Sequence, residues 1–200
     1  QPPIEVPQGA IRLNTDSQRL EFFAQDRWYE FATDSPTLDG GARALSMGGQ
    51  APSDLDIVEF VTIPTQGNAT DFGNLSVTRT QSAGLGSRVR GFCTGGMVSP
   101  GTYKNEIDFV TFSSTGDATD FGNLNGNARL LSAFSNSTRG VTAGGQPRND
   151  TIDFFTMSSA GDAIDFGDLP ASDLFGSGLA SPTRGLIKDG SDNDKTISFV

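Results

Sequence analysis

The nine residues GNATDFGNL at positions 67–75 decide the fold, because the chain repeats them twice. They return as GDATDFGNL at 116–124 and as GDAIDFGDL at 161–169, at offsets of 49 and 45 residues. Self-similarity at a fixed period is the signature of a repeat architecture, and propeller blades typically span about 40–50 residues. The repeat therefore has to be interpreted before any single residue.

Two further elements keep this spacing. An Arg-Gly pair opens a short apolar stretch that ends in Gly-Gly or Asp-Gly, and a third element alternates apolar with acidic or hydroxyl residues. The Arg-Gly pairs lie at 90–91, 139–140 and 184–185, with a degenerate copy at 43–49, and the alternating segments lie at 58–63, 107–112, 152–157 and 197–200. Alternation with a period of two predicts half-buried strands. The Gly-Asx-Ala segments at 67–69, 116–118 and 161–163 predict turns.

The chain is therefore predicted to be all-β, with about 3.5 units of 45–49 residues, each holding about four strands. No stretch of ten residues shows helical spacing. The first unit is expected to lack its two leading strands.

Residues 1–35 lie outside the repeat and are predicted to form a separate small β-meander. Apolar and polar residues alternate over 9–16, 19–23 and 26–31, and this segment holds the only tryptophan, Trp28. The Asp-Ser-Pro sequence at 34–36 is the expected linker. We therefore divide the chain into an N-terminal module, 1–35, and a repeat domain, 36–200.

Composition excludes several functions. The chain has 200 residues, no histidine, a single cysteine and a net charge of −10, with 14 basic and 24 acidic residues. Without histidine there is no Ser-His-Asp triad and no His-ligated zinc, and one cysteine forms no intrachain disulfide. The acidic balance disfavours nucleic acid and anionic membranes as partners. No apolar run approaches the roughly 20 residues that cross a bilayer. The first residue is Gln1, as expected of a processed, trimmed or partial chain.

The sequence resembles a known group of proteins over about residues 8–200. The segment GAIRLNTDSQRLEFFAQDRWYEF at 9–31 is similar to a module near the start of many phage tail-fibre and appendage proteins. The repeats resemble those of kelch-like virion proteins of marine and cyanobacterial phages. The resemblance implies a non-enzymatic virion structural protein with kelch-like β-propeller-type repeats. Three arrangements of the repeats are compatible with this resemblance. The meander completes a four-bladed propeller, or the chain is part of a longer propeller, or copies of the chain assemble around a threefold axis.

On this interpretation the N-terminal module anchors the chain to the particle, and loops between repeat strands recognise the host surface. The loops are expected at 98–105, 146–150 and 191–195. The residues that we expect to contact a host glycan or protein are Ser99, Tyr103, Lys104, Gln146, Arg148, Asp192 and Asn193. The expected partners are other virion proteins and further copies of this chain, with a trimer as the form common among fibres. The alternatives are a capsid or tail decoration protein, a glycan-cleaving fibre and a cellular kelch-like interaction protein.

The repeated charged residues favour structural roles. Asp71, Asp120 and Asp165 are expected to accept backbone N–H bonds in turns rather than to form a cation or sugar site, because a true site usually breaks a repeat's symmetry. Arg90, Arg139 and Arg184 are expected to pair with acidic residues of neighbouring strands, such as Asp108 or Asp153.

Three further features also favour structural roles. Residues 189–194 contain the densest oxygen ligands but lack the closing glutamate of a calcium loop, so a solvated hairpin is expected. Cys93 is expected in the core. No catalytic residue, metal or cofactor is predicted.

Overall fold

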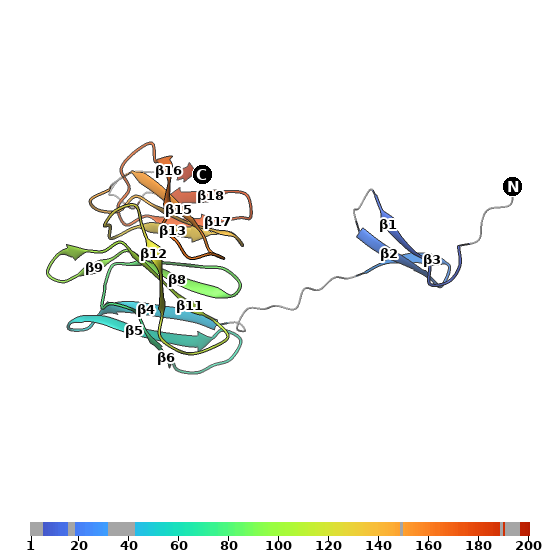
Figure 1. The fold of residues 1–200 in the computed structure, drawn as a ribbon, viewed down its shortest axis with the longest axis horizontal. Coiled ribbons are helices and arrows are strands. Elements are labelled where there is room, and N and C mark those ends of the chain that lie inside the picture. Colours follow the sequence, from blue (N-terminus) through green and yellow to red (C-terminus); the bar gives the residue numbers. More distant parts are fainter. Residues whose placement is uncertain (1–5, 16–18, 32–42, 149, 189, 191–196) are drawn as a thin grey trace. The chain divides into compact units, whose positions relative to one another are not determined.

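The computed structural model in Figure 1 describes residues 6–15, 19–31, 43–148, 150–188, 190 and 197–200. These residues form strands, turns and loops, and no helix occurs among them, so the all-β prediction is confirmed. Accordingly, none of the described segments is a helix that could cross a bilayer. The chain divides into two compact units, Gln1–Pro36 and Thr37–Val200. The predicted linker at 34–36 lies outside the described residues.

The N-terminal unit contains the antiparallel meander β1 (Ile11–Asn14), β2 (Arg19–Ala24) and β3 (Arg27–Glu30). The guanidinium of Arg12 lies 4.1 Å from the centre of the Trp28 ring and donates to Glu21 at 2.7 Å. Hydrogen bonds from Asn14 and then from Arg12 hold the pKa of Glu21 below its usual range. Aromatic and cation–π contacts across the strands thus stabilise a sheet that is too small for a full core.

The described residues of the second compact unit form four antiparallel sheets of three or four strands, which we number as units I–IV, and one two-stranded hairpin. Unit I consists of β4 (Arg43–Gln50), β5 (Asp54–Thr62) and β6 (Thr70–Asn74). Unit II consists of β7 (Ala83–Gly86), β8 (Arg90–Thr94), β11 (Glu106–Thr111) and β12 (Thr119–Asn123), and the hairpin of β9 (Met97–Val98) and β10 (Thr102–Tyr103) lies between β8 and β11.

Units III and IV repeat this plan. Unit III consists of β13 (Ser132–Ser135), β14 (Arg139–Ala143), β15 (Thr151–Thr156) and β16 (Ile164–Asp168). Unit IV consists of β17 (Ser177–Ala180), β18 (Gly185–Lys188) and β19 (Ile197–Phe199). Four strands per unit are therefore correct for units II and III. Unit I has three strands rather than the expected two, because the degenerate copy at 43–49 pairs with β5 as its counterparts do.

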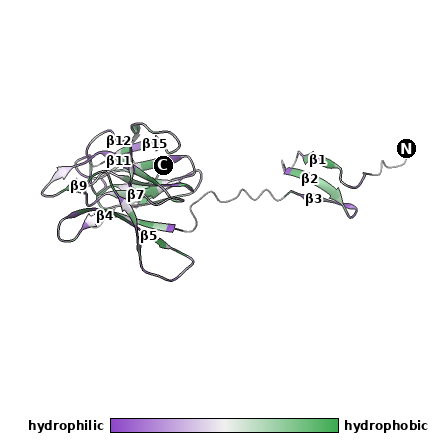
Figure 2. Ribbon diagram, turned by 60° about the horizontal axis from the view of Figure 1, so that its bottom comes forward, coloured by the Kyte–Doolittle hydropathy of each residue, from purple (hydrophilic) through white to green (hydrophobic). Residues whose placement is uncertain are grey.

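The units follow one another in chain order, from unit I in cyan to unit IV in red in Figure 1. The first strands are neighbours, since β13 packs against both β7 and β17. Each junction holds its own apolar cluster, centred on Phe72 for units I and II, on Phe121 for II and III, and on Phe134 for III and IV. Figure 2 shows the hydrophobic colour concentrated on the strands. The core is therefore a series of sheet-to-sheet interfaces, as expected when neighbouring repeats bury each other's faces.

The same backbone contact joins unit I to unit II and unit II to unit III. The turn Gly116–Ala118 of unit II donates to the last strand of unit I, from Gly116 N to Phe72 O at 2.7 Å and from Ala118 N to Asn74 O at 2.7 Å. Unit III repeats the contact on unit II, with Gly161 N to Phe121 O at 2.8 Å and Ala163 N to Asn123 O at 2.7 Å. The Gly-Asx-Ala turns at 116–118 and 161–163 thus hold each unit against the preceding one by backbone hydrogen bonds.

Gly122 has to be glycine because of this contact. Its φ is +147°, and a Cβ at this position would overlap the carbonyl oxygen of Gly161. Gly167 occupies the same place in unit III with φ +137°, but a Cβ there meets nothing within 4 Å. We expect Gly122→Ala to lower the free energy of unfolding by about 2–5 kcal/mol, through backbone strain and overpacking together. Gly167→Ala is expected to cost only the strain, about 1–3 kcal/mol.

Urea denaturation of the two variants, monitored by far-ultraviolet circular dichroism, measures this difference in stability. Equal losses of stability would mean that the turn of unit III does not press on β12 in solution.

Candidate functional site

The turns that follow the Gly-Gly pairs of units I–III form one edge of the stack, which we call the loop edge and define as residues 50–54, 97–104 and 146–148. They lie between β4 and β5, between β8 and β11, and between β14 and β15. In Figure 1 the β4–β5 turn and the β9–β10 hairpin project from the same side. Loops held by a rigid scaffold are where binding residues most often lie. The loop edge is therefore the first surface to consider for function.

The Gly-Gly pairs permit these loops to begin where they do. Gly95 has φ +59°, and a Cβ on it would lie 2.5 Å from the carbonyl oxygen of Ala128. Gly96 N donates to the same oxygen at 2.8 Å. Units I and III repeat this bond, with Gly49 N to Arg79 O at 2.9 Å and Gly145 N to Asp173 O at 2.8 Å. At each Gly-Gly pair, the segment that leads to the next unit passes directly against the backbone of the pair. The glycines are therefore needed for close packing, which is a structural role.

Ser99 joins the loops of units I and II. Its hydroxyl donates to Asp54 Oδ1 at 3.0 Å, and its backbone N–H also donates to the Asp54 carboxylate. Gln50 Nε2 lies 3.3 Å from Ser99 Oγ. The carboxylate of Asp54 therefore holds the β9–β10 hairpin against unit I.

Arg129 joins the loops of units II and III. It donates to Gln146 Oε1 at 2.7 Å and to Gln81 Oε1 at 2.9 Å, and its guanidinium lies 5.0 Å from the centre of the Tyr103 ring. Two of the predicted loop residues, Tyr103 and Gln146, thus both contact the guanidinium of Arg129. Sequence reasoning missed Arg129 and Asp54. The available signal was that Arg129 breaks the repeat, because its counterparts are Thr80 and Leu174.

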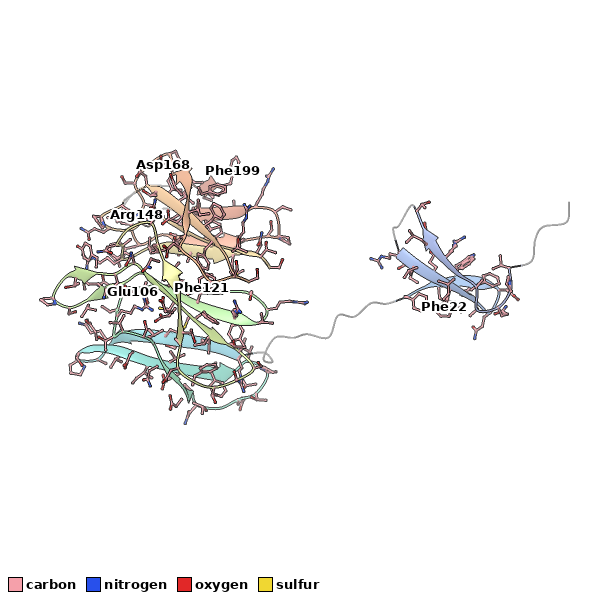
Figure 3. All side chains as sticks on the ribbon, viewed as in Figure 1. Phe22, Glu106, Phe121, Arg148, Asp168 and Phe199 are labelled. Atoms are coloured by element: carbon pink, nitrogen blue, oxygen red, sulfur yellow. The ribbon has the colours of Figure 1, made fainter. Side chains whose placement is uncertain are left out.

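The remaining predicted loop residues bind acidic partners of their own unit. Lys104 Nζ lies 2.8 Å from Glu106 Oε1, and Arg148 pairs with Asp153 through both terminal guanidinium nitrogens, Nη1 and Nη2. Figure 3 labels Glu106 and Arg148. Partial burial raises the pKa of Glu106, but the Lys104 ammonium and a backbone N–H outweigh it and lower the pKa overall. Asp192 and Asn193 lie outside the described residues.

The side chains of the loop edge are consequently held in place by hydrogen bonds and ion pairs with their neighbours. It presents hydroxyl, amide, aromatic and charged groups on an ordered backbone. In the described part of the chain no three His, Cys, Asp or Glu residues gather as a metal would require. Such a surface suits non-covalent binding of a polar ligand, for which fixed side chains reduce the entropic cost.

The repeated aspartates have the predicted backbone role in two of three copies. Asp120 Oδ1 accepts from Gly122 N at 3.2 Å, and Asp165 Oδ1 accepts from Gly167 N at 3.1 Å. Asp71 occupies the same position and is exposed like the other two. In these two copies the carboxylate accepts from the backbone N–H of the glycine two residues later, beside the register shift of its strand pair.

For Arg90 and Arg139 the predicted acidic partners are wrong, because Asp108 and Asp153 pair with Arg79 and Arg148 instead. Arg90 lies over the Phe109 ring at 4.7 Å, and its Nη1 donates to Met157 O of the next unit at 2.8 Å. Arg139 and Arg184 lie likewise over Phe154 and Phe199. The reason is the pleat: Arg90 is paired with Thr111, so it shares a face with Phe109, whereas Asp108 points to the other face.

The buried acids take other partners. Asp108 forms an ion pair with Arg79, both fully buried, and accepts from Ser76 N at 2.9 Å. Asp173 accepts from Ser132 Oγ at 3.0 Å. These bonds fasten the segments that connect successive units.

Cys93 is a core residue, as predicted, with 1% exposure. Burial raises the pKa of its thiol. Because only the thiolate reacts with disulfide reagents, we expect labelling of the native protein at pH 8 to be limited by unfolding and to accelerate sharply in denaturant. Labelling at the rate of a free cysteine would contradict this placement.

No protein-family model and no curated protein matches this chain.

Proposed function

We propose that this chain is a non-enzymatic structural protein of a phage virion, a tail-fibre or appendage component that presents its loop edge to the host surface. One observation carries the proposal: Asp54 and Arg129 hold the loops of three successive units side by side. Unit-to-unit bonds through loop side chains give a continuous surface rather than separate turns. The resemblance of residues 9–31 and of the repeats to phage appendage proteins supports the virion assignment.

The four sheets are, on this proposal, blades of a kelch-like propeller. The packing of the first strand β13 against both β7 and β17 supports it, because the first strands of propeller blades gather around the axis. The buried carboxylates Asp108 and Asp153 are held by arginines, which supports a structural rather than an enzymatic use of the acids.

The partners of this protein would be other virion proteins, further copies of the chain, and a host glycan or protein. Anchoring falls to residues 1–36, which form a compact unit separate from the repeats. Many copies on one particle would convert weak contacts of single loop edges into firm attachment.

Deletion of residues 1–36 tests the anchoring role. We expect the shortened chain to fold but to be missing from purified particles, while the full chain is incorporated. The readout is immunodetection of the repeat domain in particles and in the soluble fraction. Incorporation of the shortened chain at the level of the full chain would contradict the proposal.

A decoration or adaptor protein is the second candidate, and exposed apolar side chains of unit IV favour it. Leu179, Ile197 and Phe199 are each more than half exposed. A protein cemented between virion components would cover such side chains.

A further inference from the structure

We propose that a cavity between units I and II binds a pyranose ring of a neutral glycan. The cavity has a volume of about 150 Å³ and is lined by Phe72 of unit I and by the end of β11, the loop that follows it and the start of β12. It lies at the C-terminal end of β11, whereas the loop edge precedes the N-terminal end of this strand. The two sites share no residue, so binding in the cavity does not depend on the function proposed for the loop edge.

The loop that encloses the cavity is fixed against unit I. Gly116 N donates to Phe72 O and Ala118 N donates to Asn74 O, each at 2.7 Å. A Cβ on Gly73 would overlap the carbonyl oxygen of Gly116, so the two backbones are in direct contact. A cavity whose walls are already fixed costs a ligand less entropy on binding.

The floor of the cavity is apolar and its rim is polar. Phe72 and Val110 are each 3% exposed and contribute the floor. Ser114, Thr115 and Thr119 also line the cavity and are exposed. Their hydroxyl groups form no hydrogen bond with another described residue. Because a hydroxyl both donates and accepts, these three groups are available to the hydroxyls of a ligand.

Asp117 adds one oriented carboxylate to the rim. Its Oδ1 accepts from Asn74 N at 3.0 Å and from Asn74 Nδ2 at 3.4 Å. Its Oδ2 accepts from none of the described residues, so it is open to a ligand hydroxyl. A hydrogen bond to an ionised acceptor is roughly twice as strong as a neutral one. Asp117 therefore supplies the bond that would orient the ligand.

This lining favours a neutral ligand with several hydroxyl groups. The described lining residues include no lysine or arginine, so an anion would meet only the negative charge of Asp117. A calcium ion takes six or more oxygen ligands, and this lining offers a single carboxylate side chain. A cavity of about 150 Å³ accommodates a six-membered ring. A pyranose would place its C–H groups on the apolar floor and its hydroxyls on the rim.

Unit II differs from its neighbours at this place. Thr115 and Thr119 occur together only in unit II among the three complete copies of the turn. The residues at these two positions are Gln66 and Thr70 in unit I and Ala160 and Ile164 in unit III. The turn itself is common to all three copies and serves the fold, so the pair of hydroxyls in unit II is not needed for the turn.

The test titrates three neutral sugars into the isotopically labelled full chain and follows the backbone amides by NMR. The sugars are methyl α-D-glucopyranoside, methyl α-D-galactopyranoside and methyl α-D-mannopyranoside. We expect saturable shifts at residues 111–119 and at Asn74 with at least one of them, with a Kd of about 1–10 mM for a ligand of this size. The uronide of the sugar that binds should bind at least about threefold more weakly, because Asp117 repels its carboxylate.

Two variants remove the polar rim without changing the fold. Thr115→Ala with Thr119→Ile gives unit II the residues of unit III and should weaken binding at least about tenfold. Asp117→Asn should do the same, because it removes the charge that strengthens the orienting bond. Unit I has an asparagine, Asn68, at this position, so the turn accepts the change.

Ser113→Ala is the matched control. Ser113 is exposed and belongs to the same loop, but it is not among the lining residues. This variant should bind the sugar as the unmodified chain does. The amide spectrum of each variant verifies that it folds.

Three results would overturn the proposal. They are no saturable shift with any of the three sugars up to about 100 mM, equal binding by the Thr115→Ala, Thr119→Ile variant, and tighter binding of the uronide than of the neutral sugar. Loss of binding in Arg129→Ala with full binding in the cavity variants would place the sugar on the loop edge instead. That outcome would contradict the cavity site while leaving the function proposed for the loop edge intact.

Discussion

Replacement of Asp108 by alanine is expected to lower the free energy of unfolding by about 3–5 kcal/mol, because it strands the positive charge of Arg79 in the core. Both side chains of this ion pair have zero exposure. Asp108 also accepts from the backbone and hydroxyl of Ser76, so the change leaves further buried donors without an acceptor. The loss should appear as a lower midpoint in urea with an unchanged slope.

Two further variants distinguish the effect of an unpaired buried charge on the free energy of unfolding from the effect of removing any aspartate. Asp120→Ala removes an exposed carboxylate from the neighbouring strand β12, together with its one bond from the Gly122 N–H, and should cost no more than about 1.5 kcal/mol. The double variant Arg79→Met with Asp108→Leu removes both charges and should recover most of the loss. A loss below about 1 kcal/mol for Asp108→Ala would contradict the buried pair.

Replacement of Phe121 by alanine should be as damaging, at about 3–5 kcal/mol, because it opens a cavity in the junction between units II and III. The Phe121 ring lies 5.1 Å from that of Phe92, 5.7 Å from Phe109 and 5.4 Å from Phe155, measured between centroids. Four rings from two sheets therefore share the space it fills.

Phe166→Ala is the matched control, since Phe166 has the same place in the repeat but is half exposed. Its replacement should cost less than about 2 kcal/mol, because less apolar area leaves the core. Urea denaturation of both variants gives the comparison. Equal losses would mean that unit III is covered in solution as unit II is.

The strands of this fold could be predicted from the sequence because alternation and repeats are local signals. The segments at 107–112 and 152–157 become β11 and β15 within one residue at either end. The meander at 9–31 becomes β1–β3 for the same reason. Glycine pairs marked close backbone approach, which is what Gly95 and Gly96 provide.

The partners of the charged residues could not be predicted in this way. Arg79 stands in a connecting segment where the other units have Ala128 and Asp173, so no repeat signal assigns it to Asp108. Arg90 was assigned to Asp108 by charge, but strand register places them on opposite faces of the sheet. Arg129 reaches Gln81 and Tyr103 of unit II across a junction between units, and sequence spacing does not contain those contacts.

The candidate loop edge was predicted as a set of loops, but not as a continuous surface. Ser99, Tyr103 and Gln146 were identified from their position between strands. Their connection depends on Asp54 and Arg129, whose role follows only from how the units stack.

Electron cryomicroscopy of the intact particle that contains this chain is the most direct test of the proposed function. We expect density for the four stacked sheets at the tail periphery, with residues 50–54, 97–104 and 146–148 facing outward and residues 1–36 against the particle. Density on the capsid lattice, or with these loops buried between other virion proteins, would contradict host recognition as the function of this chain.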